Sequence, residues 1–219
     1  MDADRIIEAV RRHLVRPGLT IERRKDWPDQ VSFRTSWYAY TAQPADWRVS
    51  RESWVDEAVR VTAEGGTEWT ARNYGFLFGR NGEEWFLNDV EVIRELGRRL
   101  GDDLDPIDYA ELLAAFYSAG DIDRPVVEPL SVHEGMPAGE LVTDVDAFAE
   151  RYPYADPSLV APPRVENSNG ETSVKFFSYH QFFCEYGSTV DVLKWTVTGG
   201  GGRPVEWSRE YVAKRLTRP

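Results

Sequence analysis

Four residues of this sequence carry side chains that act as general bases or nucleophiles near neutral pH. They are the three histidines, His13, His133 and His180, and the single cysteine, Cys184. His180 and Cys184 lie four residues apart in an aromatic run with strand character, so both side chains are expected on one face. A Cys-His pair can form a reactive thiolate. Because the neighbouring residues are apolar, a half-buried histidine and an inert buried cysteine are the favoured interpretation.

Acidic residues concentrate in one quarter of the chain. Residues 101–156 hold fourteen Asp and Glu against two Arg, a net charge of −12, whereas the whole chain has a net charge of −11. A charge run of this kind usually keeps a protein soluble, but it also steers a basic partner. The side chains expected to meet such a partner are Asp102, Asp103, Asp105, Asp108, Asp121 and Asp123. Asp105 and Asp108 have a structural alternative, because they stand at a predicted helix start.

No metal or phosphate motif is complete. In an EF-hand reading from Asp103, Ile107 and Asp108 occupy the positions that need an acid and a glycine. One cysteine excludes zinc and iron-sulfur sites that need two from the same chain. The glycine run at 199–202 is followed by Arg203 and Pro204 rather than by the residues of a phosphate-binding loop, so it predicts a flexible connection. The sequence therefore predicts neither a metal nor a cofactor.

Aromatic residues are dense in the first half of the chain. They occupy both faces of the strands expected there, so most are expected in the core and some at the surface, in a pocket or a protein interface. The residues concerned are Trp37, Tyr38, Tyr40, Trp69, Tyr74, Phe76, Phe78, Trp85 and Phe86.

Apolar periodicity and capping residues predict the elements that would position these groups. Helices are expected over 2–14, 88–101, 105–120, 144–152 and, capped by Ser208, 208–216. Strands are expected over 31–40, 59–63, 69–79, 84–87, 159–165, 172–183 and 189–198. Asn81-Gly82 and Asn169-Gly170 predict hairpin turns.

The order of these elements favours an α+β fold. Mostly antiparallel sheet is expected, with an N-terminal helix, a central helical hairpin and a C-terminal helix. Residues 1–219 are expected to form a single domain, and any boundary is expected in the proline-rich acidic segment 121–163. One mixed sheet built by both halves is preferred, because the second half alone would bury few apolar residues.

The two central helices resemble a known family over a short stretch. Residues 93–120, IRELGRRLGDDLDPIDYAELLAAFYSAG, resemble the helix-loop-helix near the start of SUKH-type immunity proteins over 28 of 219 residues. In that family the motif opens the domain. Here 92 residues precede it, and the sequence that follows does not fit the family's strand pattern. The chain is therefore not assigned to the family.

The function expected is that of a non-catalytic intracellular binding or inhibitory protein, antidote- or immunity-like, that engages a basic partner through its acidic central segment. The acidic net charge argues against general nucleic-acid binding. The lack of a signal-peptide pattern and of a long apolar run predicts a cytoplasmic protein without membrane contact. The alternative is an enzyme or small-molecule binder with an aromatic-lined pocket, in which His180, with Cys184, is the polar or catalytic group.

Overall fold

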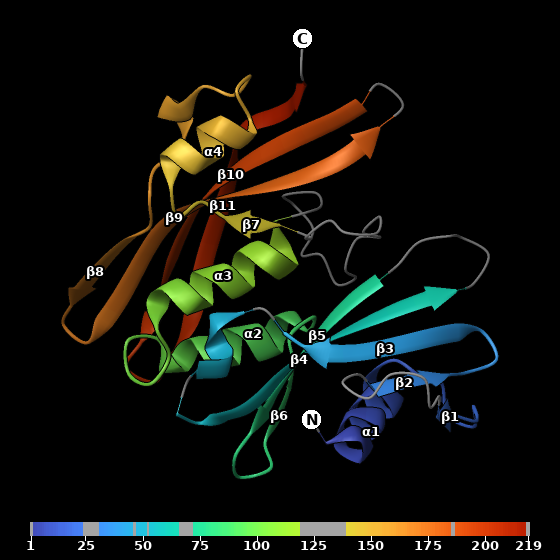
Figure 1. The fold of residues 1–219 in the computed structure, drawn as a ribbon. Coiled ribbons are helices and arrows are strands. Elements are labelled where there is room, and N and C mark those ends of the chain that lie inside the picture. The colour runs from blue at the N-terminus through green and yellow to red at the C-terminus, as the bar shows by residue number, and fades with distance from the viewer. Residues whose placement is uncertain are drawn as a thin grey trace.

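Antiparallel β-sheet makes up most of this structure, a computed structural model that describes residues 2–23, 31–45, 47–51, 53–65, 72–118, 139–184 and 187–217. At residues 50, 51, 72, 182–184, 187 and 188 the backbone alone is described. Within these ranges eleven strands form two sheets, and four α-helices accompany them (Figure 1). The predicted α+β class with a C-terminal helix is therefore wrong.

The first sheet is an antiparallel meander in which each strand pairs with the next along the chain. Its strands are β1 (Glu22–Arg23), β2 (Val31–Arg34), β3 (Tyr38–Pro44), β4 (Val55–Gly65), β5 (Arg72–Gly79) and β6 (Glu84–Phe86). The turn predicted at Asn81-Gly82 joins β5 to β6 and is confirmed. The single strand predicted over 31–40 is wrong, because the N–H of Thr35 donates to the carbonyl oxygen of Tyr38 (2.8 Å) and closes a tight turn.

The second sheet is also antiparallel, with the order β11-β10-β9, and both β7 and β8 pair with β9. Its strands are β7 (Glu140–Leu141), β8 (Arg164–Ser168), β9 (Glu171–Cys184), β10 (Gly187–Gly200) and β11 (Arg203–Thr217). The turn predicted at Asn169-Gly170 joins β8 to β9 and is confirmed. The two sheets are separate, so the expected single mixed sheet is wrong.

The last fifteen described residues form a strand instead of the predicted C-terminal helix. β11 pairs with β10 along its length, and Gly200, Gly201 and Gly202 make the connecting turn with φ of 92°, 59° and 74°. A register shift opposite Val192 and Leu193 changes which face the strand presents. Val205, Trp207 and Tyr211 consequently pack on one side of the sheet and Val212, Ala213 and Leu216 on the other. This change of face imitates the three- and four-residue spacing of a helix.

Four α-helices are described, and they alternate with the sheets in layers. They are α1 (Ala3–His13), α2 (Val90–Leu96), α3 (Pro106–Tyr117) and α4 (Val145–Arg151), accompanied by the 3-10 turns η1 (Arg48–Arg51), η2 (Gly97–Arg99) and η3 (Pro157–Leu159). Figure 1 shows α2 and α3 between the two sheets, α1 beside the first sheet and α4 beside the second. Asp105 stands at the start of α3 as predicted and caps it, and Asp2, Asp89 and Asp144 accept backbone N–H hydrogen bonds at the starts of α1, α2 and α4.

Three apolar cores follow from this layering. α1 buries Ile6 and Val10 on one face of the first sheet. The other face of the first sheet shares one core with α2, α3 and the second sheet. In this core Leu113 of α3 and Trp195 of β10 are fully buried. α4 buries Phe148 on the outer face of the second sheet. α2 packs on β11 and α3 on β7 and β9, and Tyr109 of α3 donates to the carbonyl oxygen of Ile93 in α2 (2.9 Å). The two helices therefore belong to the layer between the sheets and not to a separate helical hairpin as predicted.

Candidate functional site

The structure separates His180 from the aromatic residues of the first sheet. His180 is half-buried in β9, opposite Asp191 of β10. It lies in the second sheet, whereas the cavities described below lie on the α1 side of the first sheet. The side chain of Cys184 lies outside the described part of the structure, and so does His133. His13 ends α1 with its Nε2 2.9 Å from Oε1 of Glu84 and its ring stacked on Phe86.

Three of the six acids proposed for partner binding have contacts within the chain. Asp103 forms an ion pair with Arg99 (2.8 Å), and the carboxylate of Asp105 accepts hydrogen bonds from the backbone N–H groups that start α3. Asp108 is buried and forms an ion pair with Arg48 (3.2 Å). The side chain of Asp102 is exposed, and no contact of its carboxylate is described. Asp121 and Asp123 lie outside the described residues.

The acidic segment does not build a single described face. Asp102 and Asp103 stand at the turn that leads into α3, within the layer between the sheets. Asp146 and Glu150 belong to α4, on the outer face of the second sheet. The described acids of 101–156 are therefore divided between two layers.

A groove lies between the segment that follows α1 and the β2–β3 hairpin. Two adjoining cavities of about 550 and about 430 Å³ form it, and both are lined by Gly18, Leu19 and Thr35. The larger cavity is mainly apolar, and its further lining residues are Leu14, Arg16, Pro17, Trp37, Tyr38 and Tyr40. The smaller cavity is lined about equally by polar and apolar surface, and its further lining residues are Thr20, Glu22, Arg34 and Ser36. We call this combined surface the Trp37 groove.

Local backbone chemistry shapes both walls of the Trp37 groove. On one wall, Gly18 has φ +87°, which lets the chain reverse after α1 and run back to β1. On the other wall, Oγ1 of Thr35 accepts hydrogen bonds from the backbone N–H of Trp37 (3.4 Å) and of Tyr38 (3.2 Å). This closes the turn around Ser36 and Trp37 and holds Trp37 at its tip.

The apolar end of the groove is lined by an exposed tryptophan and a buried tyrosine. The side chain of Trp37 is 67% exposed, and Val165 is the other large hydrophobic residue found exposed in the described ranges. Tyr40, which lines the same cavity, is buried and stacks on Phe33, with ring centroids 5.0 Å apart. Burial raises the pKa of the Tyr40 phenol to about 12, so this side chain is neutral at physiological pH.

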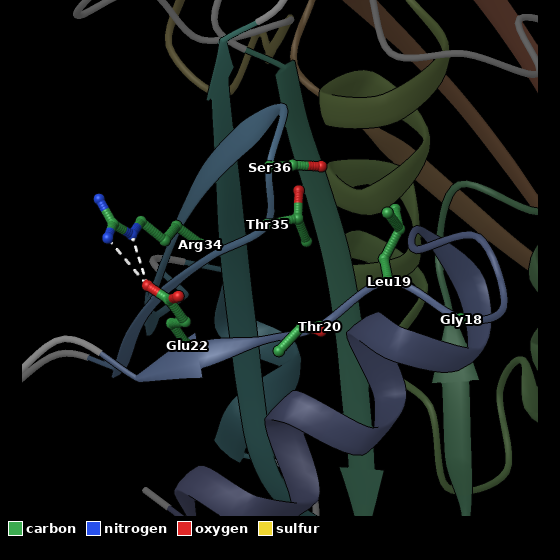
Figure 2. Close-up of a pocket in the computed structure, with 7 residues that line it drawn as sticks. All are labelled: Gly18, Leu19, Thr20, Glu22, Arg34, Thr35 and Ser36. Atoms are coloured by element: carbon green, nitrogen blue, oxygen red, sulfur yellow. Dashed lines mark hydrogen bonds and ion pairs between the residues drawn. The ribbon is translucent and has the colours of Figure 1, made fainter.

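The polar end is built around one ion pair. Figure 2 shows Gly18, Leu19 and Thr20 on the segment after α1 and the side chains of Arg34 and Glu22 joined by two hydrogen bonds. Both guanidinium contacts reach Oε2 of Glu22, from Nε at 3.0 Å and from Nη2 at 2.8 Å. The charges of this pair offset each other, which leaves the polar end with donors and acceptors but no net charge.

Sequence reasoning identified the aromatic residues of this site but not the groove. Trp37, Tyr38 and Tyr40 were among the aromatics expected to include surface positions. The turn that forms the groove was not predicted, because Thr35-Ser36-Trp37-Tyr38 contains no Gly, Asn or Pro, the residues that are typical of turns.

Comparison of the chain with protein-family models, with curated proteins and with solved structures finds no match. Across the described ranges, no three His, Cys, Asp or Glu side chains are grouped so that they could hold a metal ion. No helix in the part of the chain described here is long and apolar enough to cross a membrane.

Proposed function

We propose that this chain is a non-catalytic binding protein whose partner protein docks in the Trp37 groove. The observation that carries the proposal is the 67% exposure of Trp37 at the edge of an apolar cavity. Tryptophan and tyrosine are enriched among the residues that dominate the energy of protein interfaces, because each buries a large apolar area and keeps one polar atom available. Leaving Trp37 in water has a cost that burial by a partner removes.

The turn of the β2–β3 hairpin gives this residue a fixed position. The hydrogen bonds to Thr35 Oγ1 hold the backbone of Trp37 and Tyr38, and Tyr40, two residues further along β3, lies in the packed core. An anchor on a rigid turn loses little conformational entropy on binding, which favours affinity.

The test is affinity capture from the source cells with three immobilised proteins, followed by quantitative mass spectrometry. They are the wild type, Trp37→Ala, and the matched control Val165→Ala, which truncates the exposed apolar residue of β8. We expect a stoichiometric partner that the wild type and the control retain and Trp37→Ala loses by tenfold or more, about 1.4 kcal/mol. Equal retention by Trp37→Ala, with its melting temperature unchanged, would overturn the proposal.

A second candidate function is binding of a basic partner through the acidic segment 101–156. The observation in its favour is the net charge of −12 within that segment. Asp102, Asp146 and Glu150 are exposed acids of the segment whose neutralisation leaves the helix caps intact. If this surface binds, the triple variant Asp102→Asn, Asp146→Asn, Glu150→Gln should bind poly-L-lysine more weakly and with a flatter salt dependence than the wild type. Unchanged affinity and salt dependence would exclude it.

A further inference from the structure

We infer that the Trp37 groove recognises an extended peptide segment of the partner in which an apolar or aromatic side chain stands next to an acidic one. This inference rests on the proposed function and adds the chemistry of the partner. It follows from the charges, the shape and the continuity of the groove.

The charge of the groove differs in sign from that of the chain. Its charged lining residues are Arg16, Arg34 and Glu22, a net charge of +1, whereas the whole chain has −11. Glu22 and Arg34 are engaged with each other. The Arg16 side chain is exposed, and no ion-pair or hydrogen-bond partner for it is found among the described residues. A guanidinium in this position offers up to five N–H donors to an incoming carboxylate.

The neighbours of Arg16 define what must accompany that carboxylate. Arg16 lines the same cavity as Leu14, Leu19 and Trp37, and this cavity of about 550 Å³ has room for a large side chain. An apolar or aromatic group there would cover the exposed face of Trp37. A lysine or arginine in the same place would face Arg16 without a counter-charge in the apolar cavity, and this like-charge contact is a means of rejecting basic segments.

The continuity of the two cavities favours an extended chain over a compact ligand. The two cavities share Gly18, Leu19 and Thr35, so the groove runs from Trp37 to the Glu22–Arg34 pair. The side chains of Thr20, Ser36 and the ion pair can donate to and accept from peptide groups. The exposure of Trp37 leaves the apolar end open, unlike the enclosed sites that bury most of a small molecule.

The test is a selection from a random twelve-residue peptide display library on the full-length protein, with counter-selection on Trp37→Ala. Enriched peptides are then synthesised and titrated against the wild type, Arg16→Gln and Arg80→Gln. Arg80 is an exposed arginine at the turn after β5, away from the groove, so Arg80→Gln removes the same charge elsewhere. Tryptophan fluorescence and calorimetry give the affinities.

We expect Trp37-dependent peptides that pair Phe, Leu or Trp with Asp or Glu, and affinities about tenfold lower for Arg16→Gln but unchanged for Arg80→Gln. Changing the acidic residue of the peptide to its amide should abolish the difference between wild type and Arg16→Gln. Trp37-dependent peptides that are basic, or equal losses in the two arginine variants, would overturn this inference and leave the proposed function standing. Failure to enrich any peptide whose binding depends on Trp37 would overturn both.

Discussion

Gly65, the last residue of β4, lies directly against the backbone carbonyl oxygen of Trp37. The two strands pair there, Tyr38 opposite Gly65, and Gly65 has φ +139°. A methyl group on Gly65 would collide with that carbonyl oxygen, which no side-chain rotation relieves. The position of the groove's tip therefore depends on a glycine from another strand.

Gly65→Ala should destabilise the protein and displace the Trp37 turn. We expect a loss of about 1–3 kcal/mol in the free energy of unfolding, because the left-handed backbone and the collision add together. Gly82→Ala is the matched control, since Gly82 also has positive φ (+89°) but has open space around the added Cβ. Urea unfolding measures stability, and the affinity of a groove-binding peptide reports the turn. Equal effects of the two variants on that affinity would contradict the coupling.

Stability should decline between pH 10 and pH 12, in part because of Tyr40. Burial raises the pKa of Tyr40 from 10.0 to about 12. Above pH 10 the unfolded chain loses this proton while the folded chain retains it, so the unfolded state is favoured as pH rises. The contribution lost at pH 11 is on the order of 1 kcal/mol. Urea unfolding at pH 8 and pH 11 should show a smaller decline for Tyr40→Phe. Tyr152, whose pKa burial also raises to about 12, provides an independent second variant, Tyr152→Phe.

Ser178 should contribute more to the free energy of unfolding than the size of its side chain suggests. Its Oγ accepts hydrogen bonds from Oγ of Ser118 (2.7 Å) and from Nε1 of Trp195 (2.8 Å), all three within the shared core. Ser178→Ala leaves two buried donors without a partner, so we expect a loss of about 1–3 kcal/mol in the free energy of unfolding. Ser208→Ala, at an exposed position of β11, should change it by less than about 0.5 kcal/mol. Thermal and urea unfolding decide, and similar small losses in both variants would refute the role assigned to this network.

Of the acids around α3, Asp105 should stabilise the fold and Asp102 should have little effect on stability. Asp105→Ala removes the cap of α3 and should lower the free energy of unfolding by about 1 kcal/mol. Asp102→Ala, three residues earlier and exposed, should change it by less than about 0.5 kcal/mol. Denaturant midpoints of the two variants provide the comparison. A larger loss for Asp102→Ala than for Asp105→Ala would show that the assignment of roles is reversed.

The elements that could be predicted from sequence are those with local chemical signals. Asp105 and Pro106 mark the start of α3, and Asn81-Gly82 marks the β5–β6 turn, because caps and left-handed turns depend on the residues at those positions alone. The C-terminal strand could not be predicted in this way. Its spacing imitates a helix because the register shift opposite Val192 moves side chains from one face to the other. That shift is a property of the pairing with β10 and is invisible in the strand itself.

The groove was beyond prediction for a similar reason. The single strand predicted over 31–40 would have Phe33 and Trp37 on one face, but the turn closed by Thr35 puts Phe33 in the core and Trp37 in solvent. The acids of 101–156 show a second limit of prediction. Their number predicted a binding surface, but nothing in the sequence indicated that Asp103 and Asp108 are partnered by arginines from outside the segment, Arg99 and Arg48.

The order in which the chain is synthesised has a consequence for the helical layer between the sheets. Synthesis proceeds from the N-terminus, so the first sheet, α2 and α3 leave the ribosome before β9 and β10 exist. Until those strands arrive, the side of α2 and α3 that later contacts Phe176 and Trp195 has no cover. A nascent chain halted at that stage presents a broad apolar surface, the kind that chaperones bind and that aggregates when they are absent. The yield of folded protein should therefore depend on how quickly the ribosome completes the second sheet.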